Sequence, residues 1–317
     1  MKRMWFITGC IGLLFVTAVS YRPPATITRA ALGKKLFFEP MLSADSSVSC
    51  SSCHRPAFAF ADSVAFSAGT GGKLTRRNVP SVLNMKNRPY FFWDGRAHSL
   101  EEQALMPIQN PDEMGLPIAA AVQRLNQHPQ YARLFQQCFH EPATAKNLGL
   151  ALAAFEATLE TVDSKFDDWS NNVGKLTASE ERGRQLFVGS KARCFECHSE
   201  EDFTDDSFKS IGLFNADELN DSGQYLITGR KADIAQFKVP GLRNVALTAP
   251  YMHNGMFRTL EEVIDYYVNP YRFVKNPQYM DPRIKRGLPL NDQDKKDLVA
   301  FLKTLSDRKY LKANKQG

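Results

Sequence analysis

The feature that most constrains this chain is a five-residue run that occurs twice. The first copy is Cys50-Ser51-Ser52-Cys53-His54, and the second is Cys194-Phe195-Glu196-Cys197-His198. This C-x-x-C-H spacing is the attachment signature of c-type haem, in which both thiols bond to haem vinyl groups and the adjacent histidine binds the iron. The predicted attachment residues and proximal iron ligands are Cys50, Cys53 and His54 in one site and Cys194, Cys197 and His198 in the other.

Other roles for these cysteines explain less of the pattern. A disulfide within each pair gives no role to the adjacent histidine. A zinc site would have to bring together two pairs that lie 144 residues apart. We therefore expect two covalent haems. Cys138 lies outside both runs and is predicted to be a buried apolar thiol.

The N-terminus has the pattern of an export signal. Lys2 and Arg3 precede an apolar run from Met4 to Val19, and Ala18-Val19-Ser20 resembles a small-residue cleavage site. This predicts a signal peptide over residues 1–20 and a periplasmic protein, in agreement with the attachment of c-type haem outside the cytoplasm. If the segment is not cleaved, it would serve as an N-terminal membrane anchor.

Composition excludes several classes of protein. Of the 317 residues, 43% are apolar and 23% are charged, which excludes a disordered chain and a multi-span membrane protein. The formal net charge of +6 comes from 40 Lys and Arg against 34 Asp and Glu, without a dense basic block. We therefore predict no nucleic-acid partner.

An internal repeat predicts two domains. Residues 31–38 before the first run and residues 181–187 before the second both have the pattern of an amphipathic helix leading into a haem loop. We predict a mainly α fold with long irregular loops, built from two cytochrome c-type domains that each carry one covalently attached haem. The expected ranges are 28–168 for the N-terminal domain and 175–317 for the C-terminal domain, with a linker at 171–174.

Periodicity predicts further helices. The expected ranges are 118–135, 148–169, 260–267 and 292–305, and Thr259 is the expected N-cap of the third. Ser99 and Glu102 form a capping box that opens another helix, which Pro107 and Pro111 are expected to stop.

Four further motifs complete a family pattern. They are Phe92-Trp93-Asp94-Gly95-Arg96, Glu102-Gln103-Ala104, Asn110-Pro111-Asp112-Glu113-Met114 and Thr248-Ala249-Pro250-Tyr251-Met252-His253-Asn254-Gly255. Together with the two haem runs, they resemble the bacterial di-haem cytochrome c peroxidases and their MauG relatives. The resemblance extends from about residue 31 to about residue 305.

The resemblance implies roles that the residues alone do not settle. It implies that the N-terminal haem is peroxidatic and that the C-terminal haem passes electrons to it. Glu113 would be the acid–base above the peroxidatic iron, Gln103 would position peroxide, and Trp93 would lie between the haems. Without the resemblance, a loop carboxylate is usually a solvated surface charge, and a tryptophan usually packs in a core.

The same resemblance implies a calcium ion between the domains. Its ligands would be Asn78, Thr248 and Pro250, the last two through carbonyl oxygens, which suit a hard cation.

The C-terminal haem departs from the common pattern. The usual peroxidases have an axial methionine fourteen residues after the histidine matched by His253, and that position is Tyr267 here. The MauG branch has an axial tyrosine, which stabilises ferric iron and lowers the reduction potential relative to a thioether. Met256, Met280 and Tyr266 are the alternative ligands.

The N-terminal haem departs as well. Many usual peroxidases close this site with a histidine on a mobile loop, but residues 66–77 contain none. We therefore predict an open, five-coordinate or water-bound ferric haem that needs no reductive activation.

The other histidines carry less information. His98, His128 and His140 are predicted to be surface residues, and the resemblance makes His253 a structural or propionate-contacting residue. Arg243 is expected to pair either with a propionate or with a surface carboxylate.

Three functions are compared. The first is a di-haem peroxidase that reduces hydrogen peroxide to water with electrons from a small periplasmic donor such as cytochrome c or a cupredoxin. The second is a MauG-like enzyme that uses a high-valent di-haem state to oxidise residues of a partner protein, which Tyr267 favours. The third is an electron-transfer cytochrome without peroxidase activity, against which Glu113 and Gln103 argue.

Overall fold

The computed structural model describes Met1, residues 27–199 and residues 201–314. The predicted signal peptide, apart from Met1, lies outside these residues. Within the described ranges, no helix combines the length and apolar character needed to cross a membrane.

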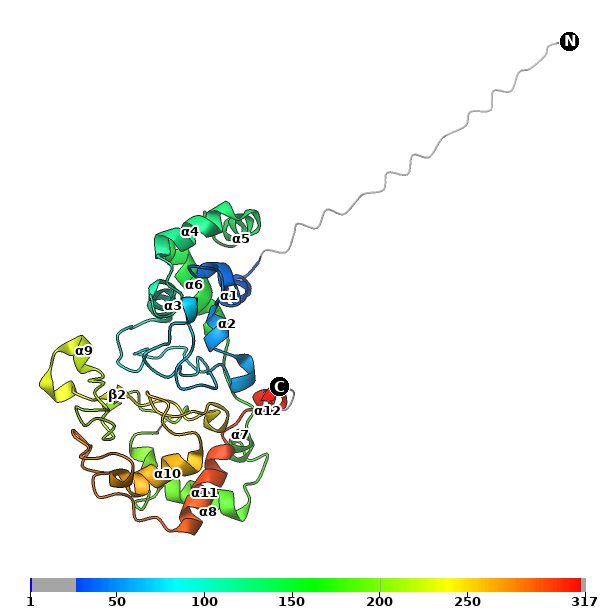
Figure 1. Cartoon of the computed structure of the whole chain (residues 1–317). Coiled ribbons are helices and arrows are strands. Elements are labelled where there is room, and N and C mark those ends of the chain that lie inside the picture. Colours follow the sequence, from blue (N-terminus) through cyan, green and yellow to red (C-terminus); the bar gives the residue numbers. More distant parts are fainter. Residues whose placement is uncertain (2–26, 200, 315–317) are drawn as a thin grey trace.

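The chain forms two lobes, which Figure 1 shows one above the other. The N-terminal lobe comprises residues 27–164. Its helices are α1 (Arg29–Phe37), α2 (Cys50–Cys53), α3 (Leu100–Gln109), α4 (Ile118–Gln127), α5 (Pro129–Phe139) and α6 (Ala145–Glu156), with 3-10 turns at Pro40–Leu42, Pro56–Phe58 and Thr70–Gly72.

The C-terminal lobe comprises residues 165–307. Its helices are α7 (Lys165–Ser170), α8 (Ala178–Val188), α9 (Tyr225–Thr228), α10 (Leu260–Val268) and α11 (Asp292–Lys303), with 3-10 turns at Cys194–Glu196, Lys231–Asp233, Val245–Leu247 and Pro270–Arg272. The two-residue strands β1 (Phe208–Lys209) and β2 (Phe237–Lys238) pair antiparallel. The fold is thus mainly helical with long irregular connections, as predicted.

Each lobe is built on one close crossing of two helices. In the N-terminal lobe, a Cβ added at Gly33 of α1 would lie 1.8 Å from the Ala151 carbonyl oxygen of α6 and 2.9 Å from Phe155. In the C-terminal lobe, a Cβ at Gly183 of α8 would lie 1.9 Å from the Asp297 carbonyl oxygen of α11 and 2.8 Å from Phe301. Glycine is required at both crossings because the backbones touch, and the repeat seen in the sequence is therefore structural.

Two predicted long helices are each broken in the structure. The helix expected at 118–135 ends at Gln127, and a second begins at Pro129, because proline lacks an amide hydrogen and its ring clashes with the preceding turn. The helix expected at 148–169 ends at Glu156, and α7 begins after Ser164, whose side chain accepts a hydrogen bond from the Asp167 amide. Val162, expected on the apolar stripe, is 76% exposed.

Three local predictions have mixed outcomes. Helix α10 begins after Thr259, whose side chain caps it as predicted. Pro107 does not stop α3, which continues to Gln109 because the lost hydrogen bond falls in its last turn. Cys138 is half-buried against the N-terminal core, because only one side of α5 packs inward.

The two lobes exchange segments near their junction. Helix α7, which includes the end of the predicted N-terminal domain, packs in the C-terminal lobe, where Phe166 contacts Phe203 and Phe301. Helix α12 (Arg308–Asn314) returns to the junction with the N-terminal lobe (Figure 1). There, the ring of Tyr310 lies edge-on to that of Phe60, with ring centroids 6.1 Å apart.

Candidate active site

The first C-x-x-C-H run forms a single helical turn. The Ser49 amide donates to Ser52 Oγ at 3.0 Å, and the His54 amide donates to the Cys50 carbonyl at 2.9 Å, so the two thiols and the imidazole are held close together. His54 Nδ1 lies 3.0 Å from the Phe60 carbonyl oxygen. A carbonyl only accepts, so Nδ1 carries the proton and Nε2 keeps its lone pair for a metal.

The second run repeats this arrangement with a different local backbone. Cys194–Glu196 is a 3-10 turn, and the His198 amide donates to the Cys194 carbonyl at 2.9 Å. His198 Nδ1 donates to the Phe203 carbonyl at 3.0 Å. Burial lowers the pKa of both His54 and His198, so both rings are neutral near pH 7, as an iron ligand must be.

The four thiols are free in the structure. Burial raises the pKa of Cys53 to about 11 and that of Cys194 to about 12, and it also raises the pKa values of Cys50 and Cys197. In the described part of the chain, no cluster of three or more His, Cys, Asp or Glu side chains forms a metal site of the zinc type. In each run, two free thiols beside a neutral imidazole are the groups that covalent haem attachment requires.

A large, mostly apolar cavity faces the second run. Cys194, Cys197, His198 and Tyr267 line it, together with the apolar side chains Ile264, Leu288, Leu298 and Leu302. An apolar cavity that contains two thiols and one imidazole has the chemistry that a porphyrin needs. The residues present therefore fit a c-type haem at this site.

Among the four candidates for the sixth ligand, only Tyr267 lines this cavity. Burial, followed by the nearby Cys194 and Cys197 thiols, raises its pKa, which places its hydroxyl near the second run. Tyr266 is fully buried, and its hydroxyl donates to the Ile211 carbonyl at 2.6 Å. The Met256 sulfur accepts from Asn254 at 3.7 Å, and Met280 packs against Gly212.

Glu113 lies near the first run. It is half-buried on the loop after α3, where Asn110 Nδ2 donates to its Oε1 at 2.6 Å. Burial first, and then negative charges that include Glu113, raise the pKa values of Cys50 and Cys53, so the carboxylate is within electrostatic range of both thiols. Burial also raises the pKa of Glu113 itself, against the opposing effects of Asn110 and Arg96.

The loop at residues 66–77, which contains no histidine, is hydrogen-bonded to the loop that carries Glu113. The Thr70 amide donates to the Glu113 carbonyl at 2.7 Å, and Thr70 Oγ1 donates to the Met114 carbonyl at 3.0 Å. Gly69 allows this approach, since a Cβ there would lie 2.5 Å from the Glu113 carbonyl oxygen. Gln103 is half-buried on α3, and no hydrogen bond reaches its side-chain amide from the residues that the structure describes.

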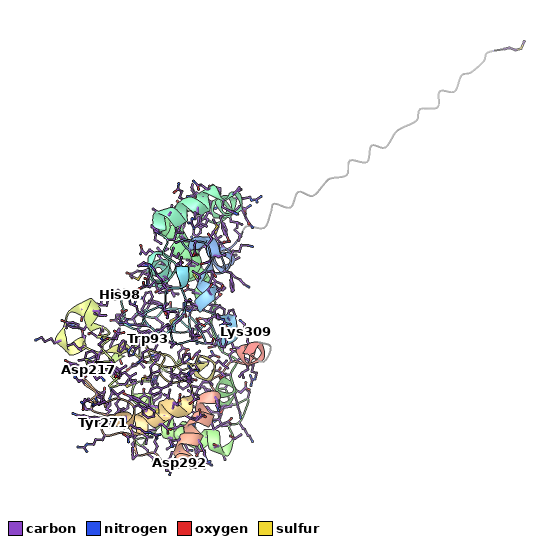
Figure 2. The ribbon with its side chains drawn as sticks, viewed as in Figure 1. Trp93, His98, Asp217, Tyr271, Asp292 and Lys309 are labelled. Carbon is purple, nitrogen blue, oxygen red and sulfur yellow. The ribbon has the colours of Figure 1, made fainter. Side chains whose placement is uncertain are left out.

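Trp93 lies at the junction of the lobes (Figure 2). Its Nε1 donates to the Asn78 carbonyl at 2.8 Å, and its own carbonyl accepts from the Lys238 amide of β2 at 2.8 Å. The indole also lines the cavity of the second run. Trp93, a residue of the N-terminal lobe, is therefore hydrogen-bonded to both lobes and lines the cavity of the second run.

The remaining predicted residues lie as follows. His98, His128 and His140 are exposed, as predicted. His253 is buried against Phe237 with ring centroids 3.8 Å apart, and burial lowers its pKa to about 4. Arg243 pairs with Asp167 at 2.9 Å and Asp202 at 3.0 Å.

One buried side chain, Glu156, is absent from the residues predicted from the sequence. It is 4% exposed, and no hydrogen bond reaches its Oε2 from the described residues. Its signal in the sequence is an acidic residue four positions after Leu152, on the apolar stripe of α6.

Comparisons with known proteins agree with this geometry. A family model of the di-haem cytochrome c peroxidases matches residues 28–175, and a cytochrome c model matches residues 180–306. The methylamine utilization protein MauG of Methylorubrum extorquens is 41% identical over 89% of this chain and 79% of that protein. The cytochrome c551 peroxidase of Nitrosomonas europaea is 36% identical over 89% of this chain and 81% of that protein.

The chain belongs to the di-haem cytochrome c peroxidase and MauG family. A solved structure of a MauG-like protein associated with microbial copper homeostasis has the same fold, with a TM-score of 0.82 and 34% identity over 88% of this chain and 89% of that one. As a member of this family, the chain is a haem-containing oxidoreductase of the di-haem peroxidase type.

Proposed function

We propose that this di-haem peroxidase reduces hydrogen peroxide to water at its N-terminal haem, with Glu113 as the acid–base and with electrons from a small donor protein. The net reaction consumes one peroxide, two protons and two electrons and forms two waters. When bound, haem supplies a redox-active iron at which peroxide is reduced. The position of Glu113 near the first thiol pair is the observation that carries the assignment.

Glu113 would move a proton within peroxide. Its carboxylate would take the proton from one peroxide oxygen and return it to the other as the O–O bond breaks, which a single group within reach of both oxygens can do. Asn110 holds Oε1 through its 2.6 Å hydrogen bond and thereby orients the carboxyl group. Gln103 on α3 would position peroxide, and Trp93 would couple the two haems.

Replacement of Glu113 tests this role. In Glu113→Gln, peroxide turnover should fall by at least about 10²-fold because the side chain no longer accepts a proton, while both haems stay attached. The wild-type rate should rise with pH as Glu113, whose pKa is raised by burial, loses its proton. Stopped-flow kinetics measures the turnover rate, and a pyridine-haemochrome assay measures the haem content. Unchanged turnover in the variant would refute the role.

A MauG-like activity on a partner protein is the second candidate, because Tyr267 lines the second cavity. Rapid turnover of peroxide with a reduced small cytochrome or cupredoxin would favour the first function. Slow turnover with a long-lived two-electron-oxidised state would favour the second.

We also propose a calcium site at the junction of the lobes. Asn78, Thr248 and Pro250 line the same cavity. The Asn78 amide nitrogen is occupied by the Val64 and Ala65 carbonyls, which leaves its Oδ1 for a cation. Extensive treatment with EGTA should lower activity and raise the mobility of the junction, and added Ca²⁺ should restore both. Atomic absorption measures the calcium content of the washed protein. Full activity in protein that contains no calcium would count against the site.

Finally, we propose that residues 1–20 export the protein to the periplasm. Mass spectrometry of the mature chain tests whether cleavage follows Ser20 and whether two haem masses are present.

A further inference from the structure

Glu156 is an isolated carboxyl group in the core of the N-terminal lobe. It ends α6, is 4% exposed, and has an Oε2 that no described group contacts by a hydrogen bond. A buried polar group without a partner costs free energy, so such groups are rare in native proteins. Its presence here therefore needs an explanation beyond packing.

The internal repeat shows which way this position faces. Phe155 packs on Gly33 at the first helix crossing, as Phe301 packs on Gly183 at the second. The residue after each phenylalanine is Glu156 in one lobe and Leu302 in the other. Leu302 lines the cavity that contains Cys194 and Cys197, so the equivalent position in the N-terminal lobe faces the first haem site.

Electrostatics gives a second, independent indication of this placement. After burial, the charge of Glu156 is the largest effect on the pKa of Cys50, ahead of Cys53 and Glu113. The carboxyl group therefore lies near the thiol that attaches the N-terminal haem. In the C-terminal lobe, the uncharged Leu302 occupies the equivalent position.

Among the residues that the structure describes, no opposite charge offsets the burial of Glu156. Helices α1, α3 and α4 pack against α6. The charged side chains of these helices close to α6 do not face Glu156. Four of them are exposed, namely Lys34, Lys35, Glu101 and Glu102. The fifth, Arg124, donates to the carbonyls of Met41 and Ser43. Burial alone raises the pKa of Glu156 to about 8. The group is therefore mostly protonated at neutral pH and can lose its proton when a nearby positive charge increases.

We propose that Glu156 is a haem-facing proton acceptor of the N-terminal site, which binds a proton from solvent when the adjacent haem gains an electron and releases it when the haem loses that electron. One electron and one proton enter together, so the net charge of the buried site is unchanged. This couples electron entry to proton uptake at the haem where peroxide reduction consumes both. The inference depends on the bound haem and not on which substrate the enzyme oxidises.

The reduction potential of the N-terminal haem tests the proposal without any peroxide. In wild-type holoenzyme, the potential should fall as pH rises through the region around 8, because the reduced haem raises the pKa of Glu156 above its value beside the oxidised haem. In Glu156→Gln and Glu156→Leu this fall should be lost, since neither side chain releases a proton. The C-terminal haem, followed by its own spectrum, is the internal reference and should keep its potential.

Two controls keep the outcome interpretable. Glu156→Leu installs the residue that the C-terminal lobe uses at this position, and Glu101→Gln removes an exposed carboxylate on α3 and should leave the potential unchanged. Reduced-minus-oxidised infrared spectra should show a protonated carboxyl C=O band in wild type that is absent from Glu156→Gln. A pH dependence retained in both Glu156 variants would overturn the proposal. Loss of turnover in Glu113→Gln with this pH dependence intact separates the two roles.

Discussion

At the scale of single residues, the sixth ligand of the C-terminal haem depends on what each candidate side chain already contacts. The Tyr266 hydroxyl donates a hydrogen bond to the Ile211 carbonyl, whereas Tyr267 lies in the cavity beside the second thiol pair. An anionic oxygen ligand stabilises ferric iron more than a thioether does. With Tyr267 as its sixth ligand, the C-terminal haem is expected to have a low reduction potential.

Replacement of Tyr267 by phenylalanine tests this assignment. The variant should lose the tyrosinate-to-iron vibrations of the ferric C-terminal haem, and its reduction potential should rise, as resonance Raman spectra and redox titration would measure. Tyr266→Phe is the matched control, and it should keep the ligand while losing about 1 kcal/mol from one buried hydrogen bond. Unaltered spectra in Tyr267→Phe would transfer the role to Tyr266, Met256 or Met280.

At the scale of elements, the two glycine-mediated helix crossings hold each haem-binding run against its lobe. Gly33→Ala would place a methyl group 1.8 Å from the Ala151 carbonyl oxygen, so α1 and α6 would have to separate. The expected loss is about 1–3 kcal/mol of folding free energy, the usual cost of overpacking, with lower haem occupancy in the N-terminal lobe. Lys34→Ala, an exposed neighbour on α1, should be nearly neutral. Chemical denaturation measures both variants, and equal stabilities would show that the crossing is more tolerant than its geometry implies.

At the scale of the whole molecule, buried ion pairs join the lobes. Arg88 pairs with Asp202 and Asp206, and Arg77 bonds to Asp94 in its own lobe and to Asp221 in the other. The side chain of Arg88 is only 10% exposed, and without it Asp206 would keep its pair with Lys238 at 3.3 Å and Asp202 its pair with Arg243 at 3.0 Å. The junction that contains Trp93 depends on these long-range contacts.

Arg88→Gln should therefore destabilise the junction by about 1.5–3 kcal/mol, because charge-assisted hydrogen bonds are lost while each carboxylate keeps another cationic partner. Unfolding of the two lobes should become less cooperative, and electron transfer between the haems should slow; calorimetry and flash photolysis measure these effects. Lys86→Gln removes the exposed pair of Lys86 with Glu160, which are 53% and 51% exposed, and should change stability by less than about 1 kcal/mol. A similar small effect in both variants would show that the Arg88 pairs do not hold the lobes together.

The local features of this protein could be predicted because the chemistry that requires them acts over a few residues. Haem attachment needs two thiols and a histidine at fixed spacing, so both attachment sites could be predicted from the sequence alone. Helix N-caps could also be predicted, because they depend on a few neighbouring residues, and Thr259 caps α10 as expected. The placement of Glu113, Trp93 and Tyr267 came from a family pattern, since no local rule distinguishes a loop carboxylate at an active site from one on the surface.

Tertiary structure alone decided the features that depend on distant partners. The break between α6 and α7 occurs because α7 packs in the other lobe. The apolar periodicity of residues 148–169 does not predict that contact. The pairs of Arg88 join residues more than 100 positions apart. Glu156 reads as an ordinary helical carboxylate until the packing of α6 removes it from water. Sequence thus predicts which cofactors attach and at which residues, whereas burial and long-range contacts decide which side chains surround those residues, because desolvation and ion pairing depend on the folded environment rather than on neighbours along the chain.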